Sequence, residues 1–248
     1  MLLRRIITNL RVQNWLAVCL DLVIVIIGIF LGLQASQWYE ARQDVAQETV
    51  IVQLLQTEFR QISDVVDTAI RFHQDEIQAL QLLHQSLSEG ELAPNSEAIV
   101  QAGLQDAMSF DPGPGRSSTY AEIVSTGQFQ LLRDRELRSA LSRYDEHVMK
   151  SDWLFSSFQQ SQRNYEAELN RHVIYTSVTK QKADSMPTGI EYFHGGIASF
   201  DFEAMAKDEE ALVAIRRLIE YHVNYQFWHG QINQFVDAIL LLLESKRS

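Results

Sequence analysis

One long apolar run near the N-terminus constrains this chain more than any other feature. It extends from Leu16 to Leu33, and Asp21 is the only charged residue within it. Trp15 and Trp38 flank the run, and the 23 positions from Leu16 to Trp38 exceed the roughly 20 helical residues that cross the hydrocarbon core of a bilayer. Tryptophans at both ends match the aromatic belts of membrane helices. The sequence therefore predicts one transmembrane helix between the two tryptophans.

The arginines predict how this helix crosses the membrane. Three arginines precede it, whereas Arg42 is the sole basic residue within about 20 positions after it. By the positive-inside rule, residues 1–15 are cytoplasmic, residues 16–38 span the membrane and residues 39–248 form one extracytoplasmic domain. The sole cysteine, Cys19, falls within the span, so the outer domain has no thiol to oxidise. The expected location is the inner membrane of a bacterium, with the large domain in the periplasm.

A cleaved signal peptide is the main alternative to a permanent anchor. Its apolar core would run from Leu22 to Leu33, which is an acceptable length. The cleavage site is poor, because the small residue expected upstream of Ala35 is replaced by Leu33. Cys19 precedes this core, so it is not a lipid-modified cysteine at a cleavage junction.

Glycine and proline are sparse, and their positions predict where three long helices begin and end. Neither residue occurs between Gln37 and Glu89. A second free stretch runs from Asp134, a predicted N-cap, to about Lys182, and Asp208 is expected to cap a last helix that nearly reaches the C-terminus. No breaker separates the first long helix from the membrane helix, so the two are expected to be continuous.

Shorter helices are expected between the long ones. Ser96 is the predicted N-cap of a helix that ends near Met108. Thr119 and Glu122 have the spacing of a capping box, and the helix that they open is expected to stop at Gly127. Irregular connections are predicted elsewhere, including the proline- and glycine-bearing stretch around residues 187–196.

Core-facing residues recur at steps of three and four in each long segment, which places them on one side of a helix. The first series is Val45, Thr49, Val52, Leu55, Phe59, Ile62, Val66, Ala69, His73, Ile77 and Leu80. The second is Leu137, Leu141, Tyr144, Val148, Ser151, Phe155, Phe158, Gln162, Tyr165, Leu169 and His172. The third is Leu212, Ile215, Ile219, His222, Gln226, His229, Asn233, Val236, Leu240 and Leu243. The predicted fold is all-α, with an N-terminal transmembrane helix and an extracytoplasmic bundle of three long helices plus short ones.

Two stretches resemble the signatures of an uncharacterised family of bacterial single-pass membrane proteins. The first runs from Asp21 to Glu40 and contains an acidic residue, an apolar run with Gly-Ile, then Leu-Gln, a tryptophan and a glutamate. The second runs from Thr119 through Phe129 to Tyr144. The resemblance implies a single membrane anchor and a mostly helical extracytoplasmic domain of unknown function. It supplies no activity.

Three residues of the predicted membrane helix are candidates for contacts within the bilayer. Asp21 is a carboxylate at headgroup level, a contact to a partner helix or a proton carrier. Gly28 and Gly32 form a GxxxG motif, which lets two helix backbones approach closely. Pairing between membrane helices predicts a homo-oligomer, but an intramolecular bundle explains the apolar stripes of the outer domain equally well.

The histidines do not predict a metal centre. His222 and His229 are seven positions apart on one helix, so their Cβ atoms are separated by roughly 10.5 Å, too far to share one zinc ion. Glu168 and His172 have i,i+4 spacing and could both reach a metal ion, but a di-iron bundle needs Glu-x-x-His on two helices, and the one such motif, Glu191 to His194, lies in the glycine-bearing connection. We expect His73, His172, His222 and His229 to be semi-buried core residues with local hydrogen bonds.

No other motif predicts catalysis. The stretch from Asp111 to Ser118 lacks the lysine of a phosphate-binding loop, so it reads as a stiff turn before a helix. There is no nucleophile elbow and no HExxH motif.

A set of aromatic residues is expected to fill the widest part of the core or to line a small pocket: Trp153, Phe155, Phe158, Tyr221, Tyr225, Phe227 and Trp228.

Charge and architecture together predict an interaction protein. The net charge of −11 disfavours nucleic acid as a partner. The leading hypothesis is a membrane-anchored periplasmic scaffold that contacts the lipid bilayer and a protein partner, without cofactor, metal or enzymatic activity. A ligand-sensing helical domain is the alternative, and its short cytoplasmic part would require a partner subunit for output.

Overall fold

The computed structural model describes residues 15–111, 113–182 and 191–245. The described chain is 81% helical and contains six α-helices, which confirms the predicted all-helical class. The helices are α2 (Trp15–Glu89), α3 (Glu97–Asp106), α4 (Ser118–Ser125), α5 (Arg135–Asn170), α6 (Phe202–Ala206) and α7 (Glu209–Glu244). A 3-10 helix, η1 (Gln128–Leu131), and four short strands complete the described elements: β1 (Val173–Tyr175), β2 (Thr179–Lys182), β3 (Glu191–His194) and β4 (Ile197–Phe200).

The chain divides into two compact units, Met1–Gln53 and Leu54–Ser248, and α2 runs through the boundary without interruption. In the first unit every described side chain from Leu20 to Leu33 is exposed. An 18-residue window of this helix has a mean hydropathy of 1.8, and none of it is buried. One helix is therefore long and apolar enough to span a membrane, by length and composition.

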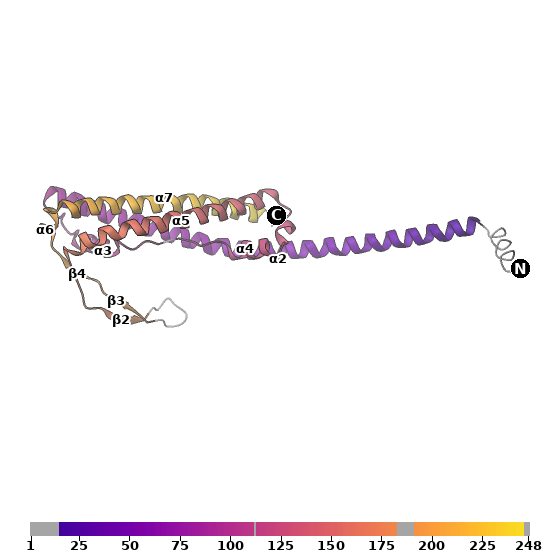
Figure 1. Ribbon diagram of the computed structural model, residues 1–248, viewed down its shortest axis with the longest axis horizontal. Coiled ribbons are helices and arrows are strands. Elements are labelled where there is room, and N and C mark those ends of the chain that lie inside the picture. The colour runs from indigo at the N-terminus through magenta and orange to yellow at the C-terminus, as the bar shows by residue number, and fades with distance from the viewer. Residues whose placement is uncertain (1–14, 112, 183–190, 246–248) are drawn as a thin grey trace. The chain divides into compact units, whose positions relative to one another are not determined.

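In the second unit, α2 from Leu54 onward lies alongside α5 and α7 (Figure 1). The rings of Phe155 and Tyr225 stack with centroids 4.2 Å apart, and those of His147 and Phe235 lie 5.2 Å apart. Residue numbers thus rise on α5 as they fall on α7, which makes the two helices antiparallel. Phe59 on α2 meets Tyr144 on α5 with ring centroids 5.0 Å apart.

The buried residues follow the predicted stripes on α5 closely and on α7 in part. On α5, Leu137, Leu141, Tyr144 and Val148 have no exposed surface. On α7, every second residue of the predicted stripe is buried, and each of the others lies one position away from a buried residue. The buried set there is Ala211, Ala214, Ile215, Leu218, His222, Tyr225, His229, Ile232, Val236, Ile239 and Leu243.

Side-chain caps explain where the later helices begin. Asp134 accepts hydrogen bonds from the amides of Glu136 and Leu137, and Asp208 does the same at the start of α7. Both N-caps are as predicted. The predicted capping box at Thr119 is wrong, because the N-cap is Ser117, two residues earlier, and α4 begins at Ser118. Ser117 accepts from the amide of Tyr120, which is the third residue of the helix.

The second long helix ends at Asn170 and not near Lys182 as predicted. The chain after it is rich in β-branched residues, which favour extended backbone. It forms β1 and β2, and each pairs antiparallel with a strand from the segment before α6: β1 with β4 and β2 with β3. The connection that was expected to be irregular therefore contains two short antiparallel β-ribbons. They were not predicted because strands this short show no long alternating pattern.

Candidate functional site

The connection between α3 and α4 ties the long helices of the second unit together. We define the α3–α4 connection as residues 107–111 and 113–117. Its Arg116 makes a bidentate ion pair with Asp145 on α5, with N–O distances of 2.6 and 2.8 Å. The hydroxyl of Tyr144 on α5 donates to the carbonyl of Gly115 at 3.0 Å. The predicted stiff turn is therefore fastened to α5 by a charged and a neutral contact.

Glu58 on α2 holds the end of this connection and the first turn of α4. Its carboxylate accepts hydrogen bonds from the hydroxyls of Ser117 and Ser118, each at 2.8 Å, and from the amides of Ser118 and Thr119 at 2.6 and 3.1 Å. Burial alone would raise the pKa of Glu58. The hydrogen bonds from Thr119, Ser117 and Ser118 together outweigh this effect, so the pKa is lowered below its ordinary value. The acidic side chain thus sits, ionised, at the helix N-terminus, where negative charge is stabilised.

The middle of the α3–α4 connection contacts three histidines, which we call the histidine cluster: His73 on α2 and His222 and His229 on α7. All three have no exposed surface. The ring centroid of His73 lies 5.1 Å from that of His222 and 5.4 Å from that of His229. The prediction that these histidines lie in the core is confirmed, but they are fully buried and not semi-buried, and their hydrogen bonds join residues distant in sequence and are not local. That they meet one another was not predicted.

Every ring of the histidine cluster contacts a backbone carbonyl of the connection. The Nε2 atoms of His73 and His229 lie 3.3 and 3.0 Å from the carbonyl oxygen of Asp111. Nε2 of His222 lies 3.2 Å from the carbonyl oxygen of Ala107. The Nδ1 atoms of His73 and His222 lie 2.9 Å apart, whereas Nδ1 of His229 is buried without a hydrogen-bond partner.

Gly113 allows the connection to approach this closely. Its φ of +70° lies in the left-handed region that favours glycine, and a Cβ there would lie 2.5 Å from Cε1 of His229. Aromatic rings close the cluster on other sides. Phe110 stacks on His222 with centroids 4.5 Å apart, and Tyr225 stacks on His73 at 5.0 Å.

The surroundings keep the cluster neutral near pH 7. Burial lowers the pKa of His73 to about 3 and that of His222 to about 4, and it also lowers the pKa of His229. One turn further along α2, Glu76 is 6% exposed. Burial, with Asp106 and Asp75 nearby, raises the pKa of Glu76 to about 8, so this carboxyl carries a proton near neutral pH.

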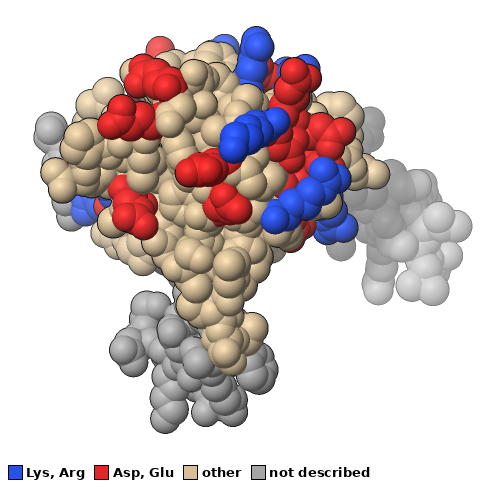
Figure 2. Space-filling view, turned by 90° about the vertical axis from the view of Figure 1, so that its left-hand side faces the viewer, with Lys and Arg blue, Asp and Glu red and all other residues tan. Residues whose placement is uncertain are grey.

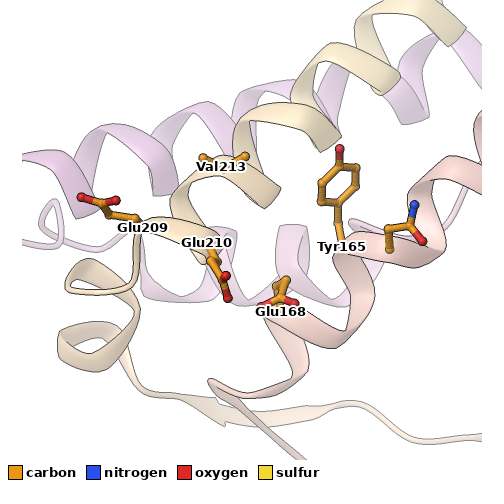
Figure 3. A pocket seen from close by; sticks show the side chains of 6 residues that line it. Tyr165, Glu168, Glu209, Glu210 and Val213 are labelled. Atoms are coloured by element: carbon orange, nitrogen blue, oxygen red, sulfur yellow. The ribbon is translucent and has the colours of Figure 1, made fainter.

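Two pockets lie outside the histidine cluster. The larger has a volume of about 370 Å³ and opens between the end of α5 and the start of α7 (Figure 3). Its lining residues are Asn164, Tyr165, Glu168, Glu209, Glu210 and Val213. Nη1 of Arg171 lies 2.8 Å from Glu168 and 3.0 Å from Glu210, so one arginine joins two of the acidic residues. Acidic side chains with basic ones among them gather at this end of the unit (Figure 2).

The smaller pocket, of about 260 Å³, lies beside Phe110 of the α3–α4 connection. Its lining residues are Met108, Phe110, Gln159, Gln162, Arg163 and Glu166.

Of the aromatic residues expected in the core, Phe155 and Tyr225 are buried. Trp153 and Phe227 are 70% and 58% exposed, so their assignment to the core is wrong.

The candidate residues of the predicted membrane helix all lie in the first part of α2. A Cβ added at Gly28 or Gly32 would meet no described atom within 4 Å. Trp38 is 60% exposed, and the guanidinium of Arg42 lies 3.9 Å from the centre of its ring. For Trp15 and Asp21 the structure describes the backbone, which is helical.

In the part of the chain that the structure describes, no group of three or more His, Cys, Asp or Glu side chains is arranged to hold a metal ion. Sequence reasoning missed the association of His73 with His222 and His229, and it assigned Ile77 to the core where Glu76 is buried instead. The available signal was the presence of histidines on the apolar stripes of two different helices.

Comparisons with known proteins identify no relative. No family model matches the chain, and no match is found among the curated proteins or the solved structures. The resemblance to an uncharacterised membrane family therefore stays a prediction, and a function has to be argued from the molecule itself.

Proposed function

We propose that this protein is a membrane-anchored extracytoplasmic scaffold that presents a helical domain to a protein partner. The observation that carries the proposal is the apolar stretch from Leu20 to Leu33, whose described side chains are all exposed. In water this surface would be strongly unfavourable, whereas lipid tails accommodate it. With the arginines on its N-terminal side, the helix is oriented so that the second unit lies outside the cytoplasm, in the periplasm of a bacterium.

The second unit suits a scaffold because several side-chain contacts join its long helices to the α3–α4 connection. The contacts of Glu58, Tyr144 and Arg116 join α2, α5 and the α3–α4 connection. A unit held in this way keeps its surface in one shape, which lowers the entropy lost when a partner binds. The acidic net charge of −11 disfavours binding to nucleic acid.

Exposed aromatic side chains are the candidate partner contacts. Trp153 on α5 and Phe227 on α7 are 70% and 58% exposed. Large aromatic residues contribute disproportionately to binding energy at protein interfaces. In the membrane, Gly28 and Gly32 supply a second contact surface, which pairs with another helix.

Photo-crosslinking in intact membranes tests the scaffold directly. A photoreactive amino acid at Trp153 should capture one partner reproducibly, identified by affinity purification and mass spectrometry. The same group at Arg143, an exposed charged position on α5, is the matched control and should capture far less. Equal, diffuse labelling from both positions, with no partner recovered, would contradict the proposal.

A ligand-sensing domain that acts through a partner subunit is the second candidate function. The pockets of about 370 and 260 Å³ favour it, since helical domains bind small molecules between their helices. A ligand that binds the folded state must raise its stability. Thermal stabilisation of the full chain in detergent micelles by a fractionated metabolite extract, combined with a failure to capture a partner, would favour sensing over scaffolding.

A further inference from the structure

The histidine cluster has fewer protons than its contacts require. A backbone carbonyl can only accept, so each contact from Nε2 to a carbonyl oxygen requires a proton on that nitrogen. A neutral imidazole carries one N–H, and using it at Nε2 leaves a lone pair on Nδ1. The Nδ1 atoms of His73 and His222 are 2.9 Å apart, a hydrogen-bond distance. With both Nε2 atoms protonated, two lone pairs would face each other there.

The contact distances indicate which nitrogen lacks its proton in the neutral cluster. Nε2 of His73 makes the longest carbonyl contact, at 3.3 Å, and its acceptor is the carbonyl of Asp111. That carbonyl already accepts from Nε2 of His229 at 3.0 Å. Moving the proton of His73 to Nδ1 therefore leaves the Asp111 carbonyl bonded, and it completes the bond to Nδ1 of His222. The same move on His222 would remove its bond to Ala107.

Two ring nitrogens of the neutral cluster then keep a free lone pair. One is Nε2 of His73, which faces the Asp111 carbonyl. The other is Nδ1 of His229, which is buried and has no hydrogen-bond partner. A proton added to His229 would create a buried donor without an acceptor, which is unfavourable. A proton added to His73 makes a new hydrogen bond.

We propose that Nε2 of His73 is the atom of the histidine cluster that binds the first added proton. In the neutral state, Nδ1–H of His73 donates to Nδ1 of His222. A proton taken from solvent adds to Nε2 of His73, which then donates to the carbonyl of Asp111, and no bond is broken. The added charge is shared across the N–H···N bond of the pair. Acidification therefore strengthens the contact between α2 and the α3–α4 connection.

The groups around His73 determine how readily it takes this proton. From α7, His222, Tyr225 and His229 face it, and Coulombic repulsion from His222 and His229 opposes a second charge. From the connection, the Asp111 carbonyl favours the charged ring. On α2, Glu76 follows one turn later. The nearest aromatic of α5, Phe155, contacts Tyr225 and His229 and carries no charge. The titration belongs to the His73–His222 pair as a whole.

Nitrogen NMR of the full chain in detergent micelles tests the proposal. With ¹⁵N-labelled histidine, the chemical shift of each ring nitrogen distinguishes a protonated from an unprotonated atom. At pH 7.5 we expect Nδ1–H on His73 and Nε2–H on His222 and His229, with a through-bond coupling between the Nδ1 atoms of His73 and His222. On acidification, Nε2 of His73 should be the first of the three rings' free nitrogens to gain a proton.

Matched variants separate this site from other histidines. In His73→Asn the side-chain amide still donates to His222, so the remaining rings should keep their proton positions while the first proton uptake is lost. His84→Gln, on the same helix outside the cluster, should change nothing in the pattern. If His73→Asn does not fold, the wild-type spectrum decides. Nε2–H on His73 at pH 7.5, or first protonation at His229 or His222, would overturn the proposal.

Discussion

At the scale of single residues, the buried histidines make folding sensitive to acid. The pKa of His73 is about 3 and that of His222 about 4 in the folded protein, against an ordinary value of 6.5. The unfolded chain therefore binds more protons between these values. Stability is fully present above about pH 6.5 and is lost as the pH falls toward 4 and then 3, and these two steps belong to the coupled His73–His222 pair and not to either ring alone.

We expect each of the two rings to destabilise the fold by about 2 kcal/mol between pH 7 and pH 5, since one pKa unit corresponds to about 1.4 kcal/mol. Thermal unfolding followed by circular dichroism in detergent micelles measures the change. The double variant His73→Phe with His222→Phe should flatten this part of the pH profile. An unchanged acid slope in that variant would contradict the assignment.

Glu76 makes the free energy of unfolding depend on pH in the opposite direction. Its pKa is raised by burial from 4.5 to about 8, so its contribution is fully present below about pH 4.5 and is lost as the pH rises toward 8. Glu76→Gln retains the shape of the protonated acid. We expect this variant to be more stable than the wild type at pH 8, by about 2–4 kcal/mol.

Asp64→Asn is the control for Glu76→Gln, because Asp64 is an exposed carboxylate on the same helix that does not contribute to the raised pKa of Glu76. It should change the midpoint of thermal unfolding at pH 8 far less. Equal stabilisation by both variants would show that general charge reduction, and not the buried carboxyl, is responsible.

At the scale of single elements, the first turn of α4 distinguishes two assignments of its cap. Ser117 accepts from the amide of Tyr120 and donates to Glu58, whereas Thr119 lies inside the helix and only donates to Glu58. We expect Ser117→Ala to lower the free energy of unfolding by about 1 kcal/mol, the usual value of an N-cap. Thr119→Ala, measured in the same denaturation assay, should change it much less. The reverse order would restore the predicted capping box.

The predicted membrane helix provides a second test at this scale. Gly28→Ile with Gly32→Ile should weaken self-association in membranes by about tenfold, corresponding to about 1.4 kcal/mol, because bulk at both positions separates the backbones. Ile27→Leu with Leu31→Ile is the matched control, since it has the same spacing one position earlier and keeps the bulk. Unchanged association in the glycine variant, measured by energy transfer between labelled chains, would remove the pairing role.

The sequence predicted the long elements better than the short ones. The free stretch from Gln37 to Glu89, and the N-caps Asp134 and Asp208, correctly located the long helices because helix breakers and caps act locally. The end of α5 at Asn170 was missed, since the strands that follow it are three or four residues long and depend on pairing with a distant segment. On α7, steps of three and four fit two neighbouring stripes, and only packing against α2 and α5 selects between them.

At the scale of the whole molecule, the periodic spacing of core-facing residues could not predict the candidate site. His73 was correctly predicted to face the core, as were His222 and His229. Their meeting depends on the lengthwise register of α2 against α7 and on the path of the α3–α4 connection. A single chain contains no local signal for either. The unpaired lone pairs of the cluster become visible only when the distances are known.

The central claim at this scale is that one apolar helix anchors an exported helical domain. A reporter fused after Ser248 tests it most directly, using an enzyme that is active only outside the cytoplasm and, in a parallel fusion, a fluorescent protein that matures only inside. The account predicts an active external enzyme and a dark fluorescent fusion. Fluorescence with an inactive enzyme would place the second unit in the cytoplasm and contradict the account.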